Sequence, residues 1–167
     1  RASGIRAITL EEGDQLISVR ETDGTRKIII ATHDGMAICF DENDVRPMGR
    51  TAVGVRGIRL REGDYVVGAA RARAGKCVLS ITENGYGKRT PVEEYRITNR
   101  GGVGIKNYAV TDKTGPVVGI KVVDGSEDLL VVTQAGILIR THVENVKITS
   151  NRATQGVIVM RFKEAGD

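Results

Sequence analysis

A short glycine-led motif recurs along the chain: Gly4-Ile5-Arg6, Gly54-Val55-Arg56, Gly104-Ile105-Lys106 and, in weaker form, Gly156-Val157-Ile158. Its glycines are separated by 50, 50 and 52 residues. A second landmark keeps nearly the same period, because three turn glycines recur at intervals of 50 and 51 residues: Gly35, Gly85 and Gly136. Two independent landmarks with one period indicate an internal repeat, which is the first feature to establish in a new sequence.

Each period carries the signals of four short strands. In the second period we expect strands over residues 55–60, 65–70, 76–82 and 86–90. The polar turn Arg61-Glu62-Gly63-Asp64 separates the first two. The last two form a hairpin through Glu83-Asn84-Gly85, because Asn-Gly tolerates positive φ. The same pattern predicts further strands over residues 15–20, 27–32, 36–40, 117–122, 128–133 and 137–141.

Four short strands in about 50 residues is the arithmetic of a propeller blade. Helix-pair repeats of this length need a period of 3.6 residues, whereas the apolar runs here alternate or are rich in Val and Ile. We therefore predict an all-β chain of β-propeller or β-pinwheel repeats forming one repeat domain over residues 1–167. The blades are approximately residues 1–50, 51–100 and 101–151, with a partial repeat at 152–167.

Three blades are fewer than a closed ring usually contains. The repeats therefore form an open arc, or their ends pair with another copy. The apolar run 156–162 (GVIVMRF) can supply a strand to the preceding blade. Without a partner it would be an exposed, aggregation-prone edge.

The cations follow the repeat. The chain has 25 Lys and Arg against 21 Asp and Glu, a formal net charge of +4, which favours a polyanionic partner only if the charges cluster. They occupy matching positions: four residues before each landmark glycine (Arg50, Arg100, Arg152), two after it (Arg6, Arg56, Lys106), and a third position before the junction (Arg46, Arg96, Lys147). Three more follow the hairpin turns: Lys88, Arg89 and Arg140. Blades related by rotation would place these cations in a band that complements a bent phosphate backbone.

A structural role is the alternative for these cations, because a repeated arginine can bind carbonyl or carboxylate groups of the next blade. The two interpretations stay equally open for Arg46, Arg96 and Lys147. Phosphate contact is favoured for the three residues that precede the landmark glycines. For Lys88 and Arg89, beside a hairpin turn, the alternative is simple solvation.

Catalytic and metal-binding arrangements are not evident. Cys39 and Cys77 lack a CxxC partner, and His33 and His142 complete no metal spacing with them, so we expect buried reduced thiols and no metal site. With 4 Tyr, 2 Phe and no Trp, platforms for stacking single-stranded bases are scarce. Any nucleic acid bound should be duplex, held by its backbone with little base readout.

Targeting signals are also not evident. The sequence shows no signal peptide and no apolar stretch of membrane-spanning length, so we expect a cytoplasmic protein without a membrane partner. Because the chain opens at Arg1 inside a repeat, we expect it to be an excised fragment.

Three stretches resemble the blade junctions of one known family, the C-terminal domain of the A chain of bacterial DNA gyrase (gyrase A): residues 45–60 (VRPMGRTAVGVRGIRL), 95–106 (YRITNRGGVGIK) and 143–162 (VENVKITSNRATQGVIVMRF). The resemblance covers essentially the whole chain. It implies a six-bladed β-pinwheel, of which this chain holds about half, with strands exchanged between neighbouring blades. Its basic perimeter wraps double-stranded DNA and so supports ATP-dependent negative supercoiling by a type II topoisomerase. The related topoisomerase IV protein shares the architecture, usually with more degenerate blades.

The same resemblance implies partners and cofactors. The rest of gyrase A, together with gyrase B, completes an A2B2 holoenzyme, which is nucleoid-associated, and its other parts hold ATP and Mg²⁺. This chain itself is expected to carry no cofactor and no catalytic residue. The family's Gln-Arg-Arg-Gly-Gly-Lys-Gly box, needed for wrapping, has no match, since Arg100-Gly101-Gly102 repeats only part of it. Wrapping, as distinct from binding, therefore stays open.

Two other functions are compatible with a propeller. A protein-interaction platform without DNA binding would present an exposed aromatic face, yet aromatic residues are few and Trp-Asp or kelch signatures are lacking. An enzyme with its site in a central channel would bring carboxylates, His or Cys together, yet the acidic residues lie in turns. The phased cations and the family resemblance favour DNA binding.

Overall fold

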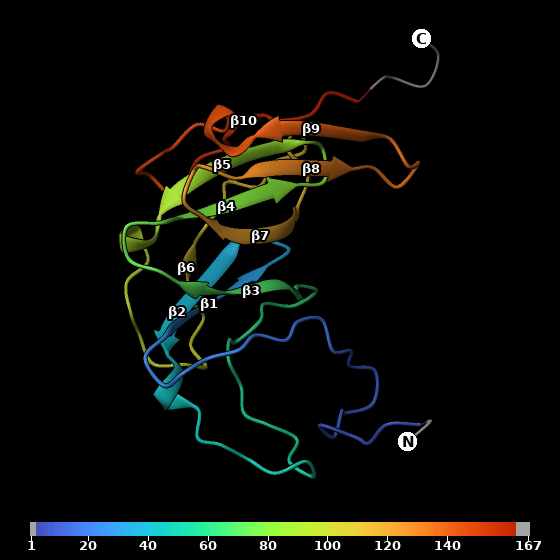
Figure 1. Ribbon diagram of the computed structural model, residues 1–167, viewed down its shortest axis with the longest axis vertical. Helices are drawn as coiled ribbons and strands as arrows, with labels where there is room; N and C mark the ends of the chain where they lie inside the picture. The colour runs from blue at the N-terminus through green and yellow to red at the C-terminus, as the bar shows by residue number, and fades with distance from the viewer. Residues whose placement is uncertain (1–2, 163–167) are drawn as a thin grey trace.

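The computed structural model describes residues 3–162 as three small antiparallel sheets, stacked along the long axis of an elongated molecule (Figure 1). The first sheet contains β1 (Lys27–Thr32), β2 (Met36–Asp41), β3 (Val66–Ala72) and β6 (Ile105–Lys106). The second contains β4 (Cys77–Thr82), β5 (Tyr86–Pro91), β7 (Val117–Val123) and β10 (Val157–Ile158). The third is the hairpin of β8 (Asp128–Val132) and β9 (Leu138–His142). The predicted all-β class is confirmed.

A single turn of 3-10 helix follows each hairpin: η1 (Glu42–Asp44), η2 (Val92–Glu94) and η3 (Val143–Asn145). The first amide of each turn donates to the residue just before the hairpin, as in Glu42 N to Arg26 O at 3.0 Å and Val92 N to Lys76 O at 2.9 Å. These turns, which the sequence did not indicate, close the base of each hairpin in the same way. The ends of the predicted first and last repeats, residues 1–2 and 163–167, lie outside the described residues.

Neighbouring repeats share their strands. In the first sheet, the hairpin β1–β2 of the first period pairs with β3 of the second (Lys27 with Ala72) and with β6 of the third (Met36 with Lys106). The second sheet repeats this plan one period later, with β7 beside β4 and β10 beside β5. A register shift even occurs at the same place, at Ala31/Thr32 and at Ile81/Thr82. A complete sheet therefore draws strands from three successive periods.

Two predicted strands are wrong. Residues 15–20 and 55–60 have no regular strand pairing. The counterpart of residues 15–20 in the next repeat is β3, which pairs with the hairpin one period earlier. The counterpart of residues 55–60 is β6, which pairs with the hairpin two periods earlier. Residues 3–162 contain no hairpin one period before residues 15–20 or two periods before residues 55–60. The strand signal is present but the pairing partner is not. The strand expected within 156–162 forms as β10, but it adds to the second-period hairpin rather than to the adjacent third one.

The landmark glycines allow the added strand to approach the hairpin. Gly104 has φ of +76°, and a Cβ built on it would lie 2.2 Å from the Ala37 carbonyl oxygen. Gly156 has φ of +72°, and its Cβ would lie 2.3 Å from Gly87 O. A side chain at either position would be strained and would meet backbone atoms that belong to the sheet. These two landmark glycines, which help to define the period, therefore lie where a strand of one repeat passes close to the hairpin of an earlier repeat.

The core lies between adjacent sheets. Ile29 from the first sheet, Val78 and Val117 from the second, and Tyr108 from the segment after β6 pack together, and all four side chains are buried. A smaller cluster between the second and third sheets contains four residues: Leu79, Val123, Val143 and Val146. Because the hairpin β8–β9 has no further strand in the described part of the chain, Leu130 on it is 65% exposed.

Replacing Gly104 with alanine is expected to lower the free energy of unfolding more than the same change at Gly54. Both glycines have positive φ, which costs another residue about 1–3 kcal/mol. Only at Gly104 does the added Cβ also meet backbone, because nothing lies within 4 Å of it at Gly54. Urea titrations of the two variants measure the difference. Equal losses would show that the close approach at Gly104 does not constrain the sheet.

Candidate nucleic-acid interface

The junctions between repeats share one backbone geometry. The amide five residues after a landmark glycine donates to the carbonyl two residues before the next landmark. This hydrogen bond occurs three times: Thr9 N to Ala52 O at 3.2 Å, Arg59 N to Gly102 O at 2.8 Å, and Ala109 N to Thr154 O at 3.1 Å. The cations phased with the landmark glycines lie in these junction loops or, for Lys106, on the short strand β6 beside them.

Two of the three arginines that precede a landmark glycine act as latches between repeats. Arg100 donates from Nη1 to Arg56 O at 3.2 Å and from Nε to Asp44 O at 2.9 Å. Arg152 donates from Nη1 to Lys106 O at 2.7 Å, the equivalent carbonyl one period later. Both side chains are half-buried, and each guanidinium, with five N–H donors, keeps others free. The structure shows the latch contacts, and phosphate contact by these residues stays a prediction.

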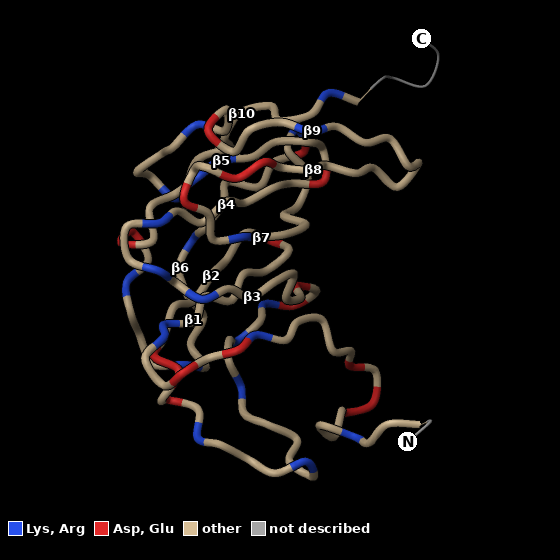
Figure 2. Tube along the Cα trace, viewed as in Figure 1, with Lys and Arg blue, Asp and Glu red and all other residues tan. Residues whose placement is uncertain are grey.

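The remaining phased cations lie on the surface. Seven are exposed, and no Asp or Glu oxygen lies within 4.0 Å of them in the described part of the chain: Arg6, Arg46, Arg50, Arg56, Arg96, Lys106 and Lys147. In Figure 2, Lys and Arg occur along the whole length of the stack, and several lie on its left-hand side near β6, where acidic segments also occur. Uncompensated cations of this kind can neutralise phosphates without first breaking an ion pair.

Lys88 lies inside the molecule, which rules out the simple solvation considered as the alternative to DNA contact, and its predicted phosphate contact stays a prediction. Its side chain is 0% exposed, and Nζ donates to Arg152 O and, at 3.4 Å, to Thr154 Oγ1. Nζ also lies 4.8 Å from the centre of the Tyr108 ring, a cation–π contact. Burial lowers the pKa of Lys88 to about 8, with a smaller contribution from the positive charge of Arg152. This lysine holds the segment that carries Arg152.

Arg89 is buried as well, with 8% of its surface exposed. Its Nε donates to Val146 O at 2.7 Å and its Nη2 to Glu144 O at 3.2 Å, so it latches the second sheet to the η3 turn. Arg140, the cation at the same position in the next hairpin, is exposed but pairs with Asp128. None of the three hairpin cations is therefore a free surface charge in this structure.

A buried polar network between the first two sheets escaped the sequence analysis. Tyr95 donates its hydroxyl to Asn107 Oδ1, and Asn107 Nδ2 donates to Ser80 Oγ at 3.3 Å. Tyr108 donates to Gln155 O, and burial raises the pKa of both tyrosines. The only signal in the sequence was two tyrosines flanking a landmark glycine. Of the cysteines, Cys39 is buried as expected and Cys77 is half-buried.

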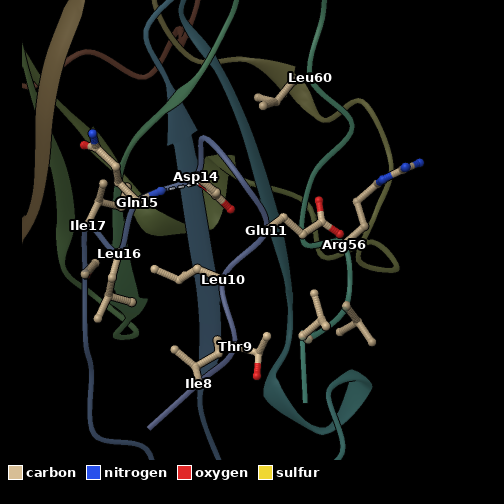
Figure 3. Close-up of a pocket in the computed structure, with 14 residues that line it drawn as sticks. Ile8, Thr9, Leu10, Glu11, Asp14, Gln15, Leu16, Ile17, Arg56 and Leu60 are labelled. Carbon is tan, nitrogen blue, oxygen red and sulfur yellow. Dashed lines mark hydrogen bonds between the residues drawn. The ribbon is translucent and has the colours of Figure 1, made fainter. Parts of the chain in front are cut away.

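A cavity of about 610 Å³ lies between residues 8–18 and 53–60, the segments that lack strand pairing (Figure 3). Apolar side chains such as Leu10 and Leu16 line it, and Asp14 Oδ1 accepts from the amide of Gln15 at 2.8 Å. In Figure 3 the side chain of Arg56 extends away from these apolar groups. The cavity lies where paired strands fill the later repeats, and its polar residues form no nucleophile–base pair. The helical segments of residues 3–162 are single 3-10 turns, and none of them could span a bilayer.

The shared strands and repeated junctions define a β-propeller-type repeat domain whose blades are completed by their neighbours. A family model described as the DNA gyrase C-terminal domain, beta-propeller, matches four consecutive segments: residues 1–23, 26–73, 78–124 and 127–167. The chain belongs to this family, the C-terminal domain of gyrase A.

Similar proteins support this assignment. The chain is 56% identical to the DNA gyrase A protein of Clostridium acetobutylicum and 51% identical to that of Staphylococcus epidermidis, over 96% of its length. It spans only 19% and 18% of those proteins. A solved gyrase A C-terminal domain superposes with a TM-score of 0.89 at 28% identity, covering 98% of this chain and 56% of that one. The C-terminal domain of a DNA topoisomerase IV gives a TM-score of 0.87 at 26% identity, covering 93% and 48%.

Replacing Lys88 with isoleucine, the residue at the equivalent position 38, should alter the dependence of stability on pH. In the folded chain the pKa of Lys88 is lowered from 10.5 to about 8. Between these values the unfolded chain binds more protons than the folded one, so the stability contributed by Lys88 rises with pH. Between pH 7 and pH 10, we expect the unfolding free energy of the wild type to rise by about 1–3 kcal/mol more than that of Lys88→Ile.

Urea titrations at several pH values measure this difference. Lys121→Met, at an exposed lysine on β7, is the control and should show no comparable change with pH. A constant difference between wild type and Lys88→Ile would contradict the buried position of the ammonium group.

Proposed function

We propose that this chain binds double-stranded DNA through its exposed, phased cations, without sequence preference, as part of the DNA-wrapping domain of a bacterial type II topoisomerase. The observation that carries the proposal is the set of seven exposed cations that have no acidic partner within residues 3–162, held in or beside junction loops of repeated geometry. Family membership supports the same conclusion, because the matched relatives are gyrase A proteins.

The junction hydrogen bonds explain how the cations could be positioned. Arg100 and Arg152 bind the carbonyls of Arg56 and Lys106, so each latch fixes the backbone from which an exposed cation projects. A cation whose backbone is already fixed loses less conformational freedom when it meets a phosphate. The latches and the exposed cations would therefore act together in holding a phosphate backbone.

Binding would rest on the phosphate backbone. Among the described residues there is no α-helix to enter the major groove, and the two buried tyrosine side chains, Tyr95 and Tyr108, are committed to the core. Base readout is therefore expected to be weak, and affinity should depend steeply on salt through release of counterions.

We assign the catalytic chemistry to parts of the holoenzyme outside this chain. The chain spans about a fifth of the gyrase A proteins that it matches. We propose that it contributes no catalytic residue, and that DNA cleavage and ATP hydrolysis occur in the rest of gyrase A and in gyrase B, in the bacterial cytoplasm. The chain would then hold DNA for the enzyme and in this way support negative supercoiling.

Charge reversal at Arg96 and Lys147 is expected to weaken binding equally for unrelated duplex sequences. Fluorescence anisotropy across a salt series measures both affinity and the slope of log K against log salt. Each phosphate contact contributes about −0.9 to that slope, so each variant should reduce its magnitude by roughly 1. Lys121→Glu makes the same charge change at an exposed lysine outside the phased positions and should have a smaller effect. Equal effects at all three positions would show that only net charge matters.

A further inference from the structure

The turn of the first hairpin brings together three side chains that could bind a metal ion. His33 and Asp34 lie in the turn between β1 and β2, and Asp64 lies just before β3. One ligand atom from each lies within 4.8 Å of the others. The sequence did not indicate this group, because Asp64 is 30 residues away from Asp34 and joins it only when the second repeat adds its strand to the first hairpin.

The three side chains are held in place by neighbouring groups. Asp64 Oδ1 accepts from two backbone amides, those of Asp34 at 3.0 Å and Tyr65 at 2.8 Å. The His33 ring stacks on Tyr65 with centroids 4.4 Å apart, and its Nδ1 lies 2.9 Å from Asp34 Oδ1. The two amides that bind Asp64 and the Tyr65 ring lie outside the proposed ligand set, and outer contacts of this kind orient the ligand side chains of metal sites.

One atom at this position is not explained by the fold. Asp64 Oδ2 is shielded from solvent and has no hydrogen-bond partner in the described structure. No Lys or Arg nitrogen in residues 3–162 lies within 4.0 Å of the Asp34 or Asp64 carboxylates. A shielded carboxylate oxygen without a partner is costly, and a bound cation removes that cost.

The equivalent junction in the next repeat shows that the architecture does not need these carboxylates. There the turn contains Glu83 and Asn84, and Gly115 occupies the position of Asp64. The backbone N–H of Asn84 donates to the carbonyl of Thr114 at 3.0 Å, so a backbone oxygen serves in place of the carboxylate. The His and the two Asp residues are therefore a particular feature of the first junction.

We propose that His33, Asp34 and Asp64 form a binding site for a divalent transition-metal ion of the Zn²⁺ type. One imidazole nitrogen and two carboxylates are a donor set that Zn²⁺ accepts, with bonds of about 2.0–2.2 Å and a fourth position for water. A tetrahedral ion with such bonds separates its donors by roughly 3.3–3.5 Å. Because the donors lie within 4.8 Å of one another, the widest pair would have to approach by up to about 1.4 Å. Rotation of the exposed Asp34 side chain can contribute to this adjustment. The ion would join the first hairpin to the loop that leads into β3.

Isothermal titration of the whole chain with zinc chloride tests the proposal. We expect saturable binding of one ion and a raised Tm. His33→Gln, which copies Gln134 of the third hairpin, and Asp64→Asn, which keeps Oδ1 as an acceptor for the two amides, should each weaken binding at least about tenfold, the scale of even outer-shell losses. Without metal, both variants should keep the wild-type circular dichroism spectrum, which separates ligand loss from unfolding.

A matched control is available in the third hairpin. His142 also contacts a carboxylate, Asp128, but Arg140 neutralises it and no second carboxylate joins them among the residues that the structure describes. His142→Gln should therefore leave zinc affinity unchanged. Co²⁺ serves as a spectroscopic probe and should show no thiolate charge-transfer band, since neither cysteine takes part. The proposal is overturned by absence of saturable binding, by full retention of binding in His33→Gln and Asp64→Asn, by its loss in His142→Gln, or by a thiolate band.

Discussion

The structure depends on one constraint: no repeat can complete its own sheet. Each hairpin leaves both of its edges open, and strands from the next two repeats fill them. An unpaired edge exposes backbone amides and carbonyls, so the sheet of each repeat is completed only by strands of its successors. The stack of sheets, the cores between them and the positions of the junction loops all follow from this exchange. The described hairpin without successors, β8–β9, is also the one whose side chains are most exposed.

The same exchange determines which cations face solvent. An added strand passes close to the hairpin at Gly104 and Gly156, and the chain before each glycine must then be held against the preceding junction. Arginines perform this task by donating to carbonyls, and in the second sheet Lys88 and Arg89 perform it from the interior. The basic residues thus divide into internal latches and exposed charges. One sequence pattern contains both groups, because both follow the repeat.

Periodicity made most of the fold predictable. The spacing of glycines and turns identified the hairpins at residues 27–40, 76–90 and 128–141 and the strands that became β3 and β7, since these depend on local signals. It could not identify which hairpin each strand joins, because pairing across 34 to 72 residues leaves no local trace. Residues 15–20 show the limit: their pattern is that of a strand, yet strand formation needs a partner. Likewise, the sequence marked Lys88 as a cation near a turn, but its burial depends on segment 151–155 lying over it.

The strand exchange also has a consequence for how the chain folds. Met36 pairs with Lys106, and Tyr86 pairs with Ile158, so each sheet is finished only by residues about 70 positions further along. Long-range contacts of this kind carry a large loop-closure entropy and slow the search for the native state. During synthesis, each hairpin must wait for two further repeats to leave the ribosome before its last edge is covered. The polar turns and the charged residues near these edges would then protect the nascent chain from pairing with the wrong partner.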